Sequence, residues 1–127
     1  MNELQRALRL HQEGRLPEAL LRYDAVLVAE PRNAEALHHS GIALYQSGNG
    51  AQALERIRKA VTIDPGMADA WSNLGLVLQE QGHHPAAVDA FDRAVRLSPR
   101  SVEFLGNLAG ALIAFGRHAE AEASARA

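Results

Sequence analysis

The sequence predicts an all-α fold made of two-helix repeats that stack along the chain. Two observations carry this prediction. Gly14, Gly48, Gly82 and Gly116 recur every 34 residues, and the apolar residues between them recur with the period of an α-helix. A fixed period of this length is typical of stacked supersecondary units, each of which buries its apolar face only against its neighbours.

Three further series of residues keep the same interval, and no insertion interrupts them. They are a small residue, a bulky residue and a proline: Ala19, Ala53, Ala87 and Ala121; Tyr23, Ile57 and Phe91; Pro31, Pro65 and Pro99. We therefore divide the single domain 1–127 into four repeats at 1–33, 34–67, 68–101 and 102–127, the last of them incomplete within its second helix.

Each series has a mechanical role in a helix–turn–helix unit. Glycine suits the left-handed residue that ends a helix, so the four glycines predict the ends of the first helices. Pro17 and Pro85 follow three residues later, where proline suits the first turn of a second helix. The second helices are predicted to end at the recurring prolines, and Asn33 and Ser101 are placed to cap the helices that follow.

The apolar residues of the third repeat predict how its two helices pack. A small residue opposite a large one lets two helices approach closely, and Gly75 and Ala87 are the predicted points of closest approach. The apolar faces are Trp71, Leu74, Gly75 and Leu78 on the first helix and Ala87, Phe91, Ala94 and Val95 on the second.

These residues carry a family resemblance. Residues 68–75, Ala-Asp-Ala-Trp-Ser-Asn-Leu-Gly, followed by Leu78, Gly82, Ala87, Phe91, Ala94 and Pro99, resemble a tetratricopeptide repeat. The resemblance covers the whole chain and implies a right-handed α-α superhelix, a solenoid whose concave groove binds extended peptides. Its repeats are similar to the bacterial arrays that precede enzymes of the O-linked N-acetylglucosamine transferase type.

The first, second and fourth repeats each depart from the family pattern. Glu3 and Arg6 stand where bulky apolar residues are expected, so the first helix is predicted to be shifted by one residue or frayed. Ser40 takes an apolar position in the second repeat, and Ala125 stands where the other repeats have Tyr, Phe or Ile. A solenoid normally closes with a polar capping helix, so we expect either a fragment or a module that pairs with another copy through its C-terminal end.

The resemblance places a binding groove on the side of each first helix that faces away from its partner. The peptide-binding residues implied in this way are Glu35, His38, His39, Ile42 and Tyr45 in the second repeat, Asp69, Ser72, Asn73, Leu76, Gln79 and Glu80 in the third, and Glu103 and Asn107 in the fourth.

Asn73 and Asn107 hold equivalent positions in this groove, with His39 and Gln5 at the same place in the earlier repeats. A column of amides can pair with any peptide backbone because each amide both donates and accepts, and it is similar to the asparagine ladder of O-linked N-acetylglucosamine transferases. The alternative is that these asparagines simply face water.

The groove positions also exclude one kind of ligand. Co-chaperones of this family grip a C-terminal carboxylate with lysine and arginine, whereas the corresponding residues here are acidic, amide or histidine. We therefore do not expect a clamp for the acidic tails of Hsp70 or Hsp90. Acidic residues such as Glu35, Asp69 and Glu103 favour a neutral or basic protein segment.

Composition narrows the function classes further. Thirteen basic residues against 15 acidic ones give a net charge of −2, which predicts neither a nucleic-acid nor a membrane partner. The clusters Arg56, Arg58, Lys59 and Arg93, Arg96, Arg100 are spaced like solvated helix sides. No signal peptide or membrane span is recognisable, so we expect a cytoplasmic protein, and the scarcity of lysine suits a GC-rich bacterial genome.

The residues offer no catalytic, metal or cofactor site. The chain has no cysteine, and His38 and His39, being adjacent on a helix, point about 100° apart. His83, His84 and His118 are interpreted as solvated turn residues, because packed helices lie about 8–10 Å apart, too far for a shared zinc ion without rearrangement. No nucleophile elbow, phosphate loop or zinc-binding helix occurs, so the chain is not expected to be an enzyme.

Three functions remain. The favoured one is a protein-interaction scaffold that binds a peptide or protein segment in its groove. The second is a regulatory or substrate-recruiting array at the N-terminus of a larger bacterial glycosyltransferase or sulfotransferase. The third is a self-assembling module.

Overall fold

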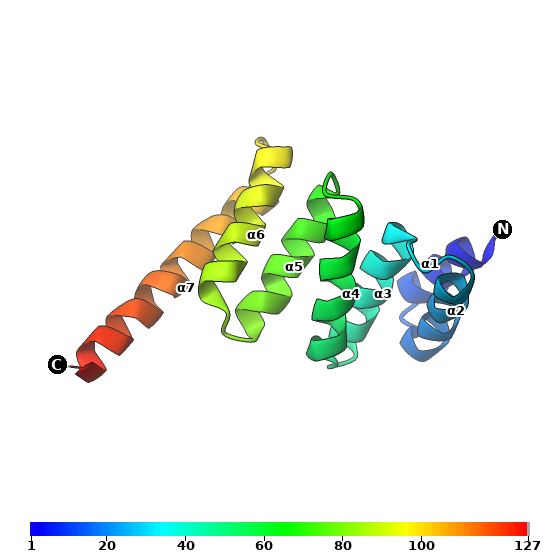
Figure 1. Cartoon of the computed structure of the whole chain (residues 1–127), viewed down its shortest axis with the longest axis horizontal. Helices are drawn as coiled ribbons and strands as arrows, with labels where there is room; N and C mark the ends of the chain where they lie inside the picture. The colour runs from blue at the N-terminus through cyan, green and yellow to red at the C-terminus, as the bar shows by residue number, and fades with distance from the viewer. Residues whose placement is uncertain (127) are drawn as a thin grey trace. The chain divides into compact units, whose positions relative to one another are not determined.

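A computed structural model describes residues 1–126 and the side chains of residues 1–123. This part of the chain contains seven helices and no strand, so the predicted all-α fold is confirmed (Figure 1). The helices form two compact units, an N-terminal unit, Met1–Gly66, and a C-terminal unit, Met67–Ala127.

Successive helices alternate between the first and second helix of a repeat. The N-terminal unit contains α1 (Glu3–Gln12), α2 (Leu16–Ala29), α3 (Ala34–Gln46) and α4 (Gly50–Ile63). The C-terminal unit contains α5 (Ala68–Glu80), α6 (His84–Leu97) and α7 (Val102–Arg126).

The turns form where the repeating glycines and caps predict them. Gly14, Gly48 and Gly82 have φ angles of 77°, 86° and 82°, the left-handed conformation that a side chain disfavours. The side chain of Asn33 accepts a hydrogen bond from the amide of Ala36 at 3.0 Å, and the hydroxyl of Ser101 accepts one from Phe104 at 3.2 Å. Both predicted caps are therefore present.

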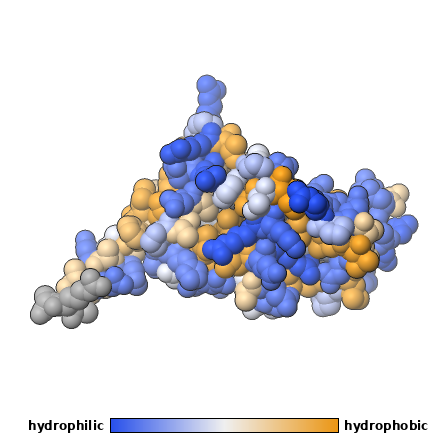
Figure 2. Space-filling view, in the orientation of Figure 1, coloured by the Kyte–Doolittle hydropathy of each residue, from blue (hydrophilic) through white to orange (hydrophobic). Residues whose placement is uncertain are grey.

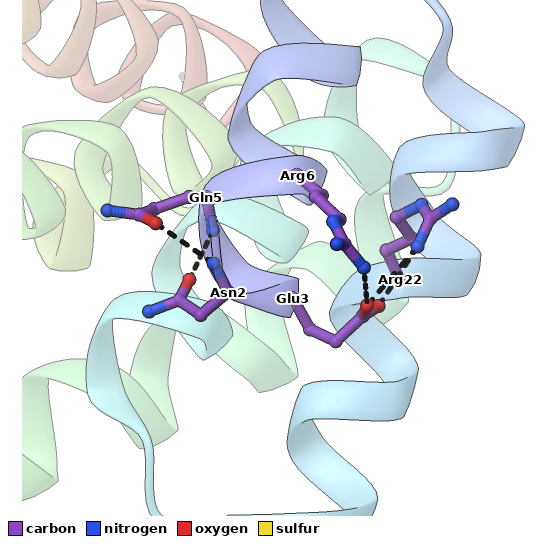
Figure 3. Close-up of polar contacts among 5 residues, drawn as sticks. All are labelled: Asn2, Glu3, Gln5, Arg6 and Arg22. Atoms are coloured by element: carbon purple, nitrogen blue, oxygen red, sulfur yellow. Dashed lines mark hydrogen bonds and ion pairs between the residues drawn. The ribbon is translucent and has the colours of Figure 1, made fainter.

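The first helix, α1, begins with a complete N-terminal cap and is not frayed, contrary to the prediction. Asn2 and Gln5 form a reciprocal capping box, in which each side chain accepts from the other's backbone amide (Figure 3). Glu3 lies between two guanidinium groups, 2.9 Å from Nη1 of Arg6 and 3.1 Å from Nη1 of Arg22 in α2.

The hydrogen bond from Arg22 is the main cause that lowers the pKa of the Glu3 carboxyl below its usual value, and Arg6 adds to the effect. An ion pair between α1 and α2 thus replaces the apolar contact that the family pattern expects at this position.

Glycine permits the closest helix packing in each unit. A methyl group added at Gly75 would lie 2.6 Å from Cε1 of Phe91, and one added at Gly41 would lie 2.5 Å from Cγ1 of Ile57. Phe91 and Ile57 are themselves completely buried. The predicted close approach at Gly75 is confirmed, and the second repeat uses the same arrangement.

Two aromatic side chains, one buried and one half-buried, contact polar partners. Tyr23 is buried, and its hydroxyl lies 2.9 Å from Nδ1 of His11, whose Nε2 lies 2.7 Å from Oε1 of Gln46. Burial is the main cause that raises the pKa of Tyr23 to about 12. Trp71 is half-buried, with the guanidinium of Arg93 4.8 Å from its ring centroid.

The fourth repeat differs from the prediction. Gly116 was expected to end a helix, but α7 continues through it without a turn, and Gly116 has no positive φ. The physical reason lies in the next residues. Gly14 and Gly82 are followed three residues later by proline, and Gly48 is followed by the capping side chain of Asn49, whereas residues 117–119 are Arg, His and Ala.

A glycine inside a helix costs only about 1 kcal/mol relative to alanine, too little to end the helix by itself. The sequence also predicts that Ala125 takes the position that is bulky in the other repeats. The side chain of Ala125 lies outside those that the structure describes.

Overpacking the seam between α5 and α6 should destabilise the C-terminal unit. Ala87 is completely buried, so Ala87→Leu has no free space to occupy and should cost about 1–3 kcal/mol of the free energy of unfolding. A urea titration followed by circular dichroism measures the change. The control is Asp89→Leu at an exposed position of the same helix, and equal midpoints for both variants would show that Ala87 is not at the packed seam.

Candidate protein-binding surface

The C-terminal unit leaves one side of α5 open beside α7. The second helix, α6, packs against the other side, where Leu74, Gly75 and Leu78 are buried. Nδ2 of Asn107 in α7 donates a hydrogen bond to Oγ of Ser72 in α5 at 3.2 Å. This contact fixes which sides of the two first helices lie together, and it makes their outer residues neighbours on one surface.

The surface of α5 and α7 combines acidic, amide and apolar side chains. Asp69, Leu76, Glu80 and Glu103 are exposed, and Leu76 keeps 37% of its surface accessible. Asn73, Gln79 and Asn107 are half-buried. No lysine or arginine occupies these positions, and Asp69, Glu80 and Glu103 are carboxylates.

Two glycines on α7 open this surface further. Side chains added at Gly106 or Gly110 would meet no atom within 4 Å, so neither glycine is needed for packing within the part of the chain that the structure describes. Ile113 continues the same side of α7 and is 55% exposed. A ligand backbone could therefore approach α7 closely at both glycines.

Ser72 was predicted to line the groove and does not. Its side chain is only 3% exposed, and its hydroxyl is occupied by Asn107. It positions Asn107 instead of meeting a ligand.

In the N-terminal unit the predicted residues lie on α3. Glu35 is exposed, and His39, Ile42 and Tyr45 are half-buried. His38 is the exception, because it is 5% exposed and therefore lies in the interior. Burial is the main cause that lowers its pKa to about 4, and the neighbouring His39 adds to the shift. The prediction that His38 lines the groove is wrong.

Side chains 35 residues apart connect neighbouring first helices, and the 34-residue repeat does not by itself predict this interval. Ser72 and Asn107 are 35 residues apart, and so are His11 and Gln46. Since the repeat is 34 residues long, side chains one residue beyond the repeat distance face each other on consecutive first helices. Polar residues searched at this interval would have revealed both hydrogen bonds.

The histidines do not form a metal site among the residues that the structure describes. The rings of His84 and His118 lie closer than helix packing alone suggested, with centroids 5.0 Å apart, and His118 pairs with Glu122 at 3.1 Å. Among the residues that the structure describes, no three histidine, cysteine or carboxylate side chains lie where they could share a metal ion. Within the same residues no helix combines the length and the apolar character needed to cross a membrane.

Comparison with known protein families decides the assignment. A family model described as "Tetratricopeptide repeat" matches residues 72–127, and one described as "TPR repeat" matches residues 41–82. The chain belongs to the tetratricopeptide-repeat family. Its all-α fold is accordingly that of a tetratricopeptide-repeat solenoid. Among curated proteins none has a significantly similar sequence.

Solved structures of other tetratricopeptide-repeat proteins share this fold. The first repeat domain of Spaghetti (RPAP3), bound to the HSP90 peptide SRMEEVD, is 19% identical, with a TM-score of 0.86 and 90% of each chain covered. A structure of MamA is 28% identical, with a TM-score of 0.81, over 91% of this chain and 67% of that one.

The O-GlcNAc transferase of Thermobaculum terrenum, a K341M mutant, is 31% identical, with a TM-score of 0.81. The match covers 87% of this tetratricopeptide-repeat chain but 21% of the transferase.

Proposed function

We propose that this protein is a non-catalytic scaffold that binds an extended, neutral or basic protein segment on the open side of its first helices. The observation that carries the proposal is the surface of α5 and α7, where exposed Asp69 and Glu103 flank half-buried amides and no predicted groove position holds lysine or arginine. The fold supports it, because RPAP3, a structural neighbour, holds a peptide.

The amides supply the sequence-independent part of this binding. Asn107 already donates to Ser72 through Nδ2, which orients its side chain and leaves its Oδ1 as an acceptor for a peptide amide. The carboxylates of Asp69 and Glu103 supply the charge preference, and exposed Leu76 and Ile113 supply apolar contact.

Removing both amides should weaken binding to neutral and basic segments. Each hydrogen bond contributes about 1 kcal/mol, so Asn73→Ala combined with Asn107→Ala should raise the Kd by about 10- to 30-fold. The measurement is fluorescence anisotropy on an array of labelled peptides that differ in charge. The control is Gln12→Ala with Gln52→Ala, which removes two exposed amides that lie on other helices, α1 and α4.

A charge reversal tests the preference separately. Asp69→Lys with Glu103→Lys should shift selection toward acidic peptides. If the wild-type protein already prefers acidic peptides, and the double asparagine variant abolishes that binding, the proposed polarity of this surface is wrong.

A second candidate is a substrate-recruiting region of a larger glycosyltransferase. The similarity to the Thermobaculum terrenum O-GlcNAc transferase supports it, because the matched part is about a fifth of that enzyme. An antibody raised against residues 1–127 tests it on cell extracts: a band near the 13.7 kDa of this chain argues against the candidate, and a much larger band supports it.

A further inference from the structure

The N-terminal unit is hollowed between its second helices, α2 and α4. A cavity of about 480 Å³ lies between them, with Leu27 and Val28 of α2 on one side, Arg56 and Lys59 of α4 on the other, and Leu37 of α3 also in its wall. A second cavity of about 650 Å³ adjoins it and shares Pro31, Glu55 and Lys59 with the first. We call the two together the α2–α4 pocket.

One wall of this pocket is apolar and accessible. Val28 is 84% exposed, whereas Leu37 is only 4% exposed and closes the interior side. Leu54 and Ile63 of α4 extend the apolar lining into the second cavity. Figure 2 shows the general pattern on one face of the molecule, where apolar side chains (orange) reach the surface between polar ones (blue). An aliphatic side chain placed in such a recess would lose contact with water and gain packing.

The charges of the pocket are predominantly positive. Arg32, Arg56, Arg58 and Lys59 line it, against the carboxylates of Asp24 and Glu55. Asp24 is already engaged, because its Oδ1 lies 2.9 Å from Nη2 of Arg56. The surplus of cations therefore lies along α4, at Arg58 and Lys59, both of which are exposed.

Arg56 adds an unsatisfied donor to this charge. Its Nη1 atom is buried and has no hydrogen-bond partner among the residues that the structure describes. Burying a donor without an acceptor is unfavourable, and 25% of the Arg56 side chain remains accessible to a ligand.

We propose that the α2–α4 pocket binds an acidic segment of a partner protein in which glutamate or aspartate side chains flank an aliphatic one. The aliphatic side chain enters the recess beside Val28 and Leu37, and the carboxylates meet Lys59, Arg58 and the guanidinium of Arg56. This site lies on other helices than the surface of α5 and α7 and has the opposite charge preference, so either site can fail without the other.

The mixed lining favours a peptide over a nucleic acid. Nucleotides offer no aliphatic side chain for the recess that Leu27, Val28 and Leu37 line. A segment of acidic and aliphatic residues satisfies both the charge and the apolar wall.

The test uses a fluorescein-labelled peptide of repeating Glu-Glu-Leu triplets, with a Gln-Gln-Leu peptide as its uncharged counterpart. Anisotropy with the full chain should show binding of the acidic peptide only, weakening by about tenfold between about 20 mM and 300 mM NaCl. Arg58→Gln with Lys59→Gln should raise the Kd by about tenfold or more. Val28→Glu, at an exposed position, should abolish binding by placing a carboxylate in the apolar wall.

The control variant is Arg96→Gln with Arg100→Gln, which removes two exposed cations from the other basic cluster. It should change the Kd less than about twofold, and unchanged circular dichroism melts should show that all variants are folded. The proposal is overturned if both double variants weaken binding equally, or if the Gln-Gln-Leu peptide binds as tightly as the acidic one. It is also overturned if a duplex RNA oligonucleotide binds more tightly than the acidic peptide and Arg58→Gln with Lys59→Gln weakens that binding.

Discussion

Replacing Phe91 by alanine should lower the free energy of unfolding of the C-terminal unit by about 3–5 kcal/mol. The ring is completely buried, and its Cε1, Cδ1 and Cζ atoms lie 2.6–2.8 Å from the position that a Cβ of Gly75 would occupy. The ring thus fills the space between α5 and α6 beside Gly75, and removing it leaves a cavity that rigid helices fill poorly. Urea denaturation followed by far-ultraviolet circular dichroism measures the loss.

A pair of variants separates the contact itself from simple loss of volume. Gly75→Ala alone should cost about 1–3 kcal/mol, because its methyl group collides with the ring. Gly75→Ala combined with Phe91→Leu should be more stable than the sum of the two single changes predicts, since the smaller side chain makes room for the methyl group. Strict additivity would mean that Gly75 and Phe91 do not meet as described.

Acid should destabilise the N-terminal unit through His38. Its pKa is about 4 in the folded protein and about 6.5 when unfolded, so between these values the unfolded chain binds the extra proton. The free energy of unfolding should therefore fall as the pH decreases from about 6.5 to about 4, and the stability lost by pH 4 is about 3 kcal/mol at most. Urea midpoints measured across this pH range test the prediction.

The matched variant is His38→Gln, which keeps a polar side chain of similar length but does not titrate. Its free energy of unfolding at pH 7 should not exceed that of the wild type. Between pH 6.5 and pH 4 this free energy should change less than it does in the wild type. Because Glu3 also has a lowered pKa, it contributes stability that is lost as the pH falls through its folded-state pKa, and Glu3→Gln corrects for this part. A wild-type protein and a His38→Gln variant with the same pH profile would contradict the assignment.

The helix boundaries followed from the sequence because they are set by local chemistry. Gly14, Gly48 and Gly82 adopt positive φ, and Asn33 caps α3 with its own side chain. Each of these features depends on residues within one turn of the chain, so the residue type and its spacing were sufficient to predict them.

The features that the sequence did not reveal depend on more distant partners. The family pattern makes Glu3 a defect of the first helix, but the cation that compensates it, Arg22, lies in the next helix. His38 was assigned to the groove from its helical phase, and only the packing of its neighbours shows that it is buried. The helix end predicted at Gly116 does not form, and the reason is local. A glycine ends a helix only when the following residues supply a stop.

The α2–α4 pocket illustrates the same limit for the candidate sites. Arg56, Arg58 and Lys59 were recognised as a basic cluster and interpreted as a solvated helix side. Leu27 and Val28, which give the cluster an apolar wall, come from the preceding repeat. No pattern within one helix predicts that these two groups share a cavity.

The positions of the aromatic residues allow the two compact units to be observed independently. Trp71 is the sole tryptophan and lies in the C-terminal unit, while both tyrosines, Tyr23 and Tyr45, lie in the N-terminal unit. Tryptophan emission therefore reports one unit and tyrosine absorbance the other. Coincident transitions would identify a single cooperative folding unit, whereas separate ones would mean that the array melts from one end, as a one-dimensional chain of coupled repeats allows.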